Sequence, residues 1–429
     1  MKNYVLPEKD KWSEICARPI FEKNELTDSV QLILSDVKSN KDKALVGLTQ
    51  AFDGVTLDSL LVSSIEIQDA IKSVSEDLKR AIQLAKTNIE RFHMSQKEES
   101  IIVETTEGVT CWRKSIAIEK VGLYIPGGSA PLFSTILMLG IPAKLAGCKE
   151  IVLCSPPNKE GKLNPAILYT ANLVGITKIF KVGGAQAIGA MAYGTESIPQ
   201  AYKIFGPGNQ FVTKAKELVQ QDGVAIDMPA GPSEVLIVAD KTCNPTFVAA
   251  DLLSQAEHGA DSQVILVSDD ADVIQQTNDE IEKQLNLLPR KEIALKALAN
   301  SKSVLCSSID QCMELSNFYA PEHLIIASRK AEKYAADVVN AGSVFLGNYS
   351  CESAGDYASG TNHTLPTNGY ARNYSGVSLD SFFRKVTFQS ITENGIRNIG
   401  PAIELMAEAE ELFAHKNAVT LRLKNLDDV

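Results

Sequence analysis

The sequence predicts an α/β protein built on parallel sheets, and three observations support this prediction. Between Val121 and Gly208 a unit of helix, glycine, strand and turn recurs three times. A second run of alternating strands and helices extends from Val235 to Leu346. Such alternation is typical of parallel strands joined by crossover helices. The chain has 429 residues, of which 45% are hydrophobic and 22% charged, an ordinary globular composition with room for two or more domains.

The first hundred residues are predicted to be helical. Seven apolar residues recur at intervals of three or four and form one stripe of an amphipathic helix: Ile71, Val74, Leu78, Ile82, Ala85, Ile89 and Phe92. The stripe indicates a packing surface. His93 lies beside it, and we expect an ordinary surface position for this residue.

The first alternating run has four predicted strands: Val121–Ile125, Glu150–Cys154, Lys178–Val182 and Tyr202–Phe205. The helices between them are predicted at Thr135–Ala146, Ala166–Val174 and Gln186–Tyr193, with C-caps at Gly147, Gly175 and Gly194. Turns rich in glycine and proline follow the strands. Because ligands of parallel sheets usually bind at the carboxyl ends of strands, these turns are candidate walls of a site.

The second run has five predicted strands: Val235–Ala239, Gln263–Val267, Ser303–Leu305, Leu324–Ala327 and Ser343–Leu346. After about Thr387 the chain is predicted to be mainly helical, and Ile403–Phe413 is the clearest helix.

Charge and hydropathy exclude several classes of protein. Lys and Arg number 42 and Asp and Glu 53, so the formal charge is 42 − 53 = −11. An acidic chain without basic clusters is a poor binder of nucleic acid or anionic membranes. No stretch approaches the roughly 18–20 apolar residues that span a bilayer. Charges come too early at the N-terminus for a signal peptide, so we expect a cytoplasmic location.

Cysteine usage fits the same location. The eight cysteines are scattered and form no Cys-x-x-Cys pair. We expect most of them to be buried free thiols in a reducing compartment.

Four of the five histidines lie after Asp251, each near other polar residues. Gln255 and His258 are three residues apart on a predicted helix, Phe247–His258, so they share a face and could hold one metal ion. A histidine at a helix end before a capping glycine is the plainer alternative.

Glu322 and His323 stand where a helix ends at a proline and a strand begins, an arrangement that suits an acid/base pair or a solvated turn. A long polar loop, 352–367, carries Asp356 and His363 and indicates a binding site. His415, beside Glu410, could be an ordinary cation at a helix end.

Gln255, His258, Asp356 and His415 together offer mixed nitrogen and oxygen ligands that suit a zinc-type ion. The His-Glu-x-x-His, Gly-x-Ser-x-Gly, P-loop and Gly-x-Gly-x-x-Gly motifs are absent. The residues alone therefore predict an α/β metalloenzyme with an acid/base pair and leave its substrate open.

At these motifs the sequence resembles the histidinol dehydrogenase family. The resemblance runs in register through nearly the whole chain, in the blocks Val121–Thr135, Val182–Ile188, Phe205–Asn209, Asp227–Val235, Leu252–Gly259, Ala320–Leu324, Gly355–Pro366 and Ala414–Val419. The family oxidises L-histidinol to L-histidine through L-histidinaldehyde, with NAD used twice and one zinc ion per subunit. The resemblance implies two incomplete Rossmann-like domains and a homodimer with shared sites.

The resemblance also implies roles for individual residues. Zinc ligands would be Gln255, His258, Asp356 and His415, the last one reaching the neighbouring subunit's metal site. Glu322 and His323 would be the catalytic proton-transfer residues. Besides the ligands and this pair, the substrate would contact Ser233, His363 and Glu410. NAD would contact Tyr124, Gln186 and Asn209.

We expect four parts of the chain on the same basis: 1–25, a small helical segment; 26–120 with 234–375, the first α/β domain, which carries most of the catalytic residues; 121–233, the second α/β domain, with the NAD contacts; and 376–429, a small helical domain reaching the partner.

Two other classes of function are weighed against this one. A zinc hydrolase would share the metal but would not need NAD. A binding protein with two α/β lobes would tolerate Glu322→Gln with little loss of function. A thiohemiacetal on Cys111 or Cys154 is not the leading interpretation, because Glu322 and water reach the acid without a thiol.

Overall fold

The computed structural model describes residues 1–19, 23–127 and 131–427. Residues 1–95 and 119–379 form one compact unit, and residues 96–118 and 380–429 form a second. Each unit is described separately. Part of the expected N-terminal segment, 20–22, and part of the first family block, 128–130, lie outside the described residues.

The first unit contains a six-stranded sheet in the order β1-β11-β10-β9-β12-β13, with all neighbours parallel. Its strands are β1 (Lys2–Val5), β9 (Glu234–Ala239), β10 (Gln263–Ser268), β11 (Lys302–Leu305), β12 (His323–Ala327) and β13 (Ser343–Leu346). The five strands expected in the second alternating run are all present. β9, β10 and β12 are buried along their whole length, as parallel strands covered on both faces usually are.

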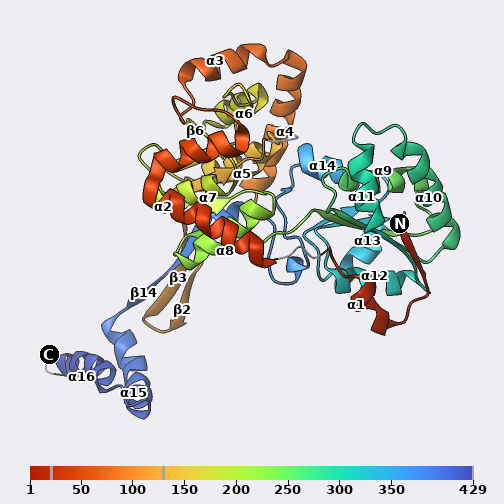
Figure 1. Cartoon of the computed structure of the whole chain (residues 1–429). Coiled ribbons are helices and arrows are strands. Elements are labelled where there is room, and N and C mark those ends of the chain that lie inside the picture. The colour runs from red at the N-terminus through yellow and green to blue at the C-terminus, as the bar shows by residue number, and fades with distance from the viewer. Residues whose placement is uncertain (20–22, 128–130, 428–429) are drawn as a thin grey trace. The chain divides into compact units, whose positions relative to one another are not determined.

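Helices cover both faces of this sheet (Figure 1). They are α1 (Trp12–Ile15), α9 (Pro245–Ala256), α10 (Ala271–Leu285), α11 (Lys291–Ala299), α12 (Ile309–Tyr319), α13 (Ala331–Tyr334) and α14 (Glu352–Tyr357), with short 3-10 turns at Lys9–Lys11, Ala335–Asp337 and Tyr370–Arg372. Alternate residues of β9 enter different cores. Val235 and Ile237 pack with α9 and α10, whereas Leu236 and Val238 pack with α12.

The first unit also contains a five-stranded parallel sheet in the order β6-β5-β4-β7-β8. Its strands are β4 (Lys120–Tyr124), β5 (Glu150–Ser155), β6 (Lys178–Lys181), β7 (Lys203–Phe205) and β8 (Ala225–Ile226). The helices around it are α2 (Lys23–Asp53), α3 (Ser64–Ser73), α4 (Glu76–Met94), α5 (Ser134–Ala146), α6 (Pro165–Val174), α7 (Gly184–Tyr193) and α8 (Gln210–Gln221). Two parallel sheets with crossover helices confirm the predicted α/β class.

Glycine ends three of these helices as predicted: Gly147 is the C-cap of α5, Gly175 that of α6 and Gly194 that of α7. Gly147 after α5 and Gly175 after α6 have φ of 87° and 81°, the left-handed region that a side chain disfavours.

The packing does not show the expected grouping of residues 26–120 with the second alternating run in one domain. Val30, Leu34 and Val37 of α2 share a core with α7, on the five-stranded sheet.

The expected single helix over residues 71–92 is two helices. Val74 is extended, with ψ of 130°, and ends α3, while the Ser75 side chain accepts the Leu78 N–H and starts α4. The surface position expected for His93 is also wrong, because its side chain is fully buried. His93 Nδ1 lies 2.8 Å from the Ile89 carbonyl oxygen, and Nε2 lies 3.3 Å from Asn362 Nδ2, a partner distant in sequence.

The N-terminal segment is not simply helical either. Lys2–Val5 is an edge strand that pairs with β11. Four residues are too few to show a strand periodicity, so sequence reasoning missed it. The long polar loop expected at 352–367 is partly wrong as well, since its first six residues form α14.

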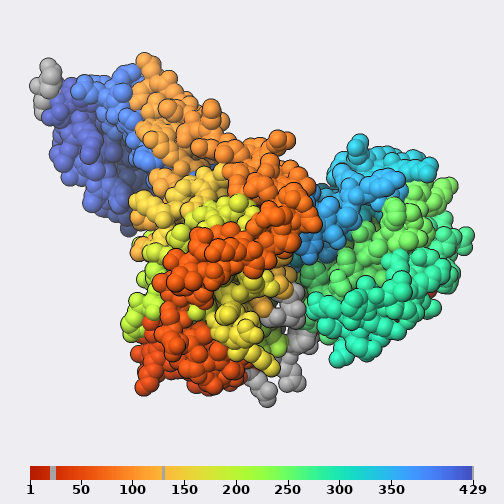
Figure 2. Space-filling model, turned by 90° about the horizontal axis from the view of Figure 1, so that it is seen from above, coloured from red at the N-terminus to blue at the C-terminus, as the bar shows by residue number. Residues whose placement is uncertain are grey.

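The second unit is a three-stranded antiparallel sheet followed by two helices. The strands are β2 (Ile102–Thr106), β3 (Val109–Ala117) and β14 (Phe383–Ile391), in the order β14-β3-β2. The helices are α15 (Glu393–Ala409) and α16 (Phe413–Asp427), and a 3-10 turn, Leu379–Phe382, precedes β14. Figure 2 shows the orange surface of β2 and β3 beside blue residues of the same unit.

Two C-terminal expectations are corrected. The chain does not become helical at Thr387, because all nine residues of β14 pair with β3. The helix expected at Ile403–Phe413 is interrupted, since α15 ends at Ala409 and Glu411 adopts φ of 59° before α16 begins. Within the described ranges, no helix combines the length and apolar character needed to cross a membrane.

Candidate active site

Glu322 and His323 lie together where α12 ends and β12 begins, at the junction that the sequence predicts. Their side chains are buried, and His323 Nδ1 is 3.6 Å from Glu322 Oε2. Neighbours on an extended strand point to opposite sides. Here Ala320, in the left-handed region with φ of 55°, turns the chain just before the pair. The side chains of Glu322 and His323 therefore lie on the same side of the chain.

The backbone of Glu234 holds both members of the pair. Its N–H donates to Glu322 Oε2 at 2.9 Å, and its carbonyl oxygen is 3.3 Å from His323 Nδ1. A proton on Nδ1 would satisfy this carbonyl and leave the lone pair on Nε2. Among the residues that the structure describes, His323 Nε2 has no hydrogen-bond partner although it is buried. It lies 3.7 Å from Asp356 Oδ1.

Burial shifts the protonation of both groups. It raises the pKa of Glu322 well above its usual range and lowers the pKa of His323 to about 3. His323 is therefore neutral at physiological pH. A neutral imidazole with a free nitrogen can accept a proton.

A cluster suited to a cation lies beside the pair. His258, Glu352 and Asp356 each offer one potential ligand atom, and these three atoms lie within 4.8 Å of one another. Glu352 and Asp356 are one turn apart on α14, and His258 follows the C-terminus of α9. Burial raises the pKa of Asp356 to about 7 and that of Glu352 well above its usual range. Buried carboxylates crowded in this way are stabilised by a bound cation.

Gln255 and His258 adjoin this cluster from the end of α9. The Gln255 amide is assigned with its nitrogen toward Glu352, to which the nitrogen donates at 2.6 Å. In the opposite orientation the amide oxygen would have only hydrogen-bond acceptors around it. The His258 side chain is accessible, yet partial desolvation, with a smaller effect of Arg290, lowers the pKa of its imidazole.

His363 contacts the cluster from the loop after α14. Its Nδ1 is 3.0 Å from the Asp356 carbonyl oxygen, and its Nε2 is 3.1 Å from Thr135 Oγ1 of α5. Burial lowers the pKa of His363 to about 4. Ser233 immediately precedes β9, next to the Glu234 backbone that holds the pair.

A cavity of about 840 Å³ extends from this region along the five-stranded sheet. Tyr124, Gln186, Asn209 and His258 all line it. The Tyr124 hydroxyl oxygen accepts the Gly184 N–H at 3.1 Å, and Asn209 Oδ1 accepts the first N–H groups of α8. Turns after β4, β6 and β7 therefore form cavity walls, as their glycines and prolines predict.

Two helix N-termini adjoin the cavity. α7 begins at Gly184, and α8 begins at Gln210 behind its Asn209 cap. The positive end of the helix dipole favours an anion at such a place.

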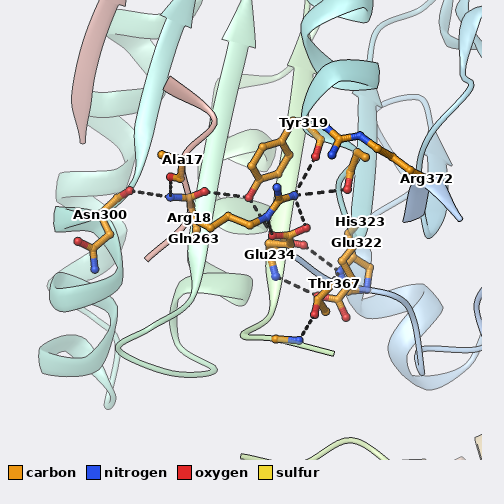
Figure 3. A network of polar contacts seen from close by, with 12 residues as sticks. Ala17, Arg18, Glu234, Gln263, Asn300, Tyr319, Glu322, His323, Thr367 and Arg372 are labelled. Carbon is orange, nitrogen blue, oxygen red and sulfur yellow. Dashed lines mark hydrogen bonds and ion pairs between the residues drawn. The ribbon is translucent and has the colours of Figure 1, made fainter. Parts of the chain in front are cut away.

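A buried ion pair lies next to the Glu322–His323 pair (Figure 3). Arg18 Nε donates to Glu234 Oε2 at 2.6 Å, and Nη2 donates to Oε1 at 2.8 Å. The Tyr319 hydroxyl donates to Glu234 Oε2 at 3.0 Å. The sequence does not reveal this network, because its members are far apart along the chain.

Of the residues expected at the site, Gln255, His258, Glu322, His323, Asp356 and His363 are brought together in the first unit. Glu410 and His415 belong to the second unit, where both are exposed. Sequence reasoning missed Glu352. Its only signal was its position four residues before Asp356 in the polar segment.

The cysteines are arranged as expected. All eight are free, and five of them are buried. Burial raises the pKa of the Cys154 thiol, which is completely enclosed, and Cys111 lies in the second unit. A buried protonated thiol is a poor nucleophile, which disfavours a thiohemiacetal on Cys154.

Comparisons with known proteins agree on one family. The family model of histidinol dehydrogenase matches residues 16–423. Histidinol dehydrogenase of Bacteroides fragilis strain YCH46 is 60% identical over 426 residues, which cover 99% of this chain and 100% of the relative. That of Pasteurella multocida strain Pm70 is 54% identical over 402 residues, or 94% and 93% of the two chains. The crystal structure of histidinol dehydrogenase from Elizabethkingia anophelis has a TM-score of 0.98 and 62% identity, and covers 100% of this chain and 99% of that one.

Proposed function

The chain belongs to the histidinol dehydrogenase family of histidine biosynthesis, and we propose that it oxidises L-histidinol to L-histidine through bound L-histidinaldehyde. In the first step the alcohol and NAD⁺ give the aldehyde, NADH and a proton. In the second, the aldehyde, water and NAD⁺ give the acid, NADH and a proton. The observation that carries this proposal is the buried Glu322–His323 pair beside a cluster of potential metal ligands.

The proposed resident metal is one zinc ion per subunit. Gln255, His258 and Asp356 would hold it, together with His415 from the partner subunit. The fit rests on the crowded ligand atoms of His258, Glu352 and Asp356 and on the raised pKa values of the two carboxyl groups. Nitrogen and oxygen donors in this combination suit zinc. Bound zinc supplies a Lewis-acidic anchor for the amino and imidazole nitrogens of the substrate.

The two catalytic residues have separate tasks. His323 Nε2, buried and without a partner among the described residues, accepts the hydroxyl proton as hydride passes to NAD⁺. Glu322 accepts a proton from the water that adds to the aldehyde carbon. His323 acts again when the resulting diol loses its second hydride. The same base thus serves both oxidations, and Glu322 is specific to the second.

NAD is proposed to occupy the 840 Å³ cavity, in contact with Tyr124, Gln186 and Asn209. The N-termini of α7 and α8 suit its pyrophosphate. One carboxylate oxygen of Asp53, in the cavity wall, is shielded from solvent and accepts no hydrogen bond within the described part of the chain. It can accept one from a ribose hydroxyl. Ser233, His363 and the partner subunit's Glu410 would contact histidinol.

We propose that the protein forms a homodimer through the second unit and that the two subunits share their active sites. This unit exposes large apolar residues, among them Ile102, Leu405, Met406, Phe413 and Leu421, each at least 57% exposed. Apolar surface of this extent favours a protein partner. A second copy of the chain would bury it and would receive His415 and Glu410.

Mixed dimers test the sharing. His415→Ala and His258→Ala are each expected to abolish activity, because each removes a metal ligand. Mixing the two variants should restore part of it, since a mixed dimer retains one site with all ligands. No recovery in mixed dimers verified by mass would show that each site is built from one chain.

The reaction is tested by the NADH yield from limiting L-histidinol, with protein stripped of metal and then supplied with zinc. About two NADH per histidinol, only with metal restored, is the expected result for a four-electron oxidation. About one would mean that the aldehyde escapes and that the Glu322 assignment is wrong. Metal-dependent hydrolysis without NAD would favour a zinc hydrolase, and binding of histidinol without NADH would favour a binding protein.

A further inference from the structure

We propose that Arg18 is a positioning residue for Glu322 and His323. The backbone of Glu234 holds both of these side chains, which project from the turn after α12. The guanidinium of Arg18 joins the Glu234 side chain to that turn. The inference rests on the proposed function of that pair. Arg18 lies about three hundred residues before the pair in sequence, and Figure 3 draws no hydrogen bond or ion pair from Arg18 to either side chain of the pair.

The first contact of Arg18 is a two-point ion pair. Nε and Nη2 donate to the two carboxylate oxygens of Glu234 at 2.6 and 2.8 Å. The side chains are 16% and 2% exposed, so water screens the pair weakly. A planar fork fixes the orientation of a carboxylate as well as its position, which a lysine ammonium cannot do.

The second contact of Arg18 is with the turn before the pair. Nη2 also donates to the Tyr319 carbonyl oxygen at 2.8 Å and lies 3.4 Å from that of Ala320. These are terminal carbonyls of α12, which lack partners within the helix. Ala320 adopts φ of 55°, unfavourable for a residue with a Cβ atom, so the turn needs support from its surroundings.

Glu234 connects the ion pair to the chemistry. Its N–H donates to Glu322 Oε2 at 2.9 Å, and its carbonyl oxygen lies 3.3 Å from His323 Nδ1. Fixing the Glu234 side chain therefore fixes the peptide groups that orient both residues.

Further contacts hold the residues around Arg18 in place. Its guanidinium stacks 3.9 Å from the centroid of the Tyr319 ring, and the Tyr319 hydroxyl reaches Glu234 and Gln263. The carbonyl of Ala17 accepts from Gln263 Nε2 at 3.1 Å and from Lys302 Nζ at 2.8 Å. The N-terminal segment is thus tied to β10 and β11, and Arg18 enters the site from a fixed position.

Substitution of Arg18 tests the proposal in the full-length, zinc-loaded protein. Arg18→Met should lower kcat for histidinol and for histidinaldehyde by about 10²-fold, since a misplacement near 1 Å has this effect. Zinc content and the KM values for histidinol and NAD should stay close to wild type. Arg18→Lys keeps the charge without the fork and should recover only part of kcat.

Arg372→Met is the matched control. Arg372 also donates to a terminal carbonyl of α12, that of Phe318, but it is exposed and is not an ion-pair partner of Glu234. Its loss should leave kcat unchanged. An equal fall of kcat in both variants would point to general support of the helix end and would overturn the specific role of Arg18.

Two further measurements separate positioning from folding. Arg18→Met combined with Glu234→Gln removes both buried charges, so it should fold even if the single variant does not, and its kcat should remain low. Added guanidinium should partly restore kcat in Arg18→Ala, because Arg18 lines a second cavity, of about 720 Å³, through which a small cation can enter.

Wild-type turnover in the double variant would overturn the proposal, and so would a failure of guanidinium to raise kcat in folded Arg18→Ala. These outcomes differ from failure of the proposed function, in which the wild-type protein itself would form no NADH from histidinol.

Discussion

The two parallel sheets of the first unit carry their proposed functional residues at opposite ends of their strands. On the five-stranded sheet, Tyr124 ends β4 and Asn209 follows β7, so the cavity lies at the carboxyl ends. On the six-stranded sheet, His323 begins β12 and Ser233 precedes β9, so the proposed catalytic pair lies at the amino ends. The usual location at carboxyl ends thus holds for one sheet and is wrong for the other.

The difference follows from which ends of the helices face each site. Crossover helices present N-termini at the carboxyl edge of a parallel sheet and C-termini at the amino edge. α7 and α8 bring positive dipole ends to the cavity, where a pyrophosphate would bind. α9 and α12 bring negative ends to the proposed catalytic cluster, together with Glu322, Glu352 and Asp356. One edge favours an anion and the other a cation.

The sharpest test of this division is His323→Asn, at the amino edge. Turnover should fall by about 10²–10⁴-fold, the usual contribution of a general base. Zinc content and the dissociation constant for NAD should be unchanged, because the zinc ligands and the carboxyl edge are intact. NADH formation, metal analysis and NAD titration measure these quantities. Retained turnover would remove His323 from the mechanism.

Glu322→Gln separates the two chemical steps at the same edge. The amide keeps the size of the side chain but cannot accept a proton from water. Single-turnover oxidation of histidinaldehyde should slow at least about tenfold more than oxidation of histidinol. Equal slowing of both steps would contradict the role in water activation.

Asn209→Ala tests the carboxyl edge, with Asn164→Ala as its matched control. Both asparagines cap helices through their side-chain oxygens, but of the two only Asn209 lines the cavity. Each substitution should lower the free energy of unfolding by about 1 kcal/mol. Only Asn209→Ala should also raise the KM for NAD, by about two- to tenfold, the worth of one lost hydrogen bond. The same KM change in both variants would attribute it to helix fraying.

The smallest effect is expected for Cys154→Ala on β5. Because chemistry is assigned to the amino edge of the other sheet, both oxidation steps should keep their wild-type rates. Loss of one buried sulfur atom should lower the free energy of unfolding by about 1 kcal/mol. Stopped-flow rates and thermal unfolding measure the two quantities. A selective loss of aldehyde oxidation would revive a thiol intermediate.

Local patterns predicted much of the fold. Buried parallel strands are short apolar runs bounded by turn residues, and all nine predicted strands are present because neighbouring residues carry that signal. The failures come from distant partners. β14 is a strand because nine residues of β3 pair with it, and His93 is buried because Asn362 and its surroundings cover it.

The sequence by itself determined the α/β class, the glycine-rich turns around the cavity and, through its resemblance to a family, His258 and Asp356 of the cluster but not Glu352. Each of these features depends on short runs of consecutive residues. Tertiary structure alone decided that the proposed catalytic pair stands at the amino ends of its sheet and that Arg18, Glu234 and Tyr319 lie next to it. Burial and the direction of a crossover helix depend on segments hundreds of residues apart, and a local pattern carries no information about which distant side chain will satisfy a buried charge.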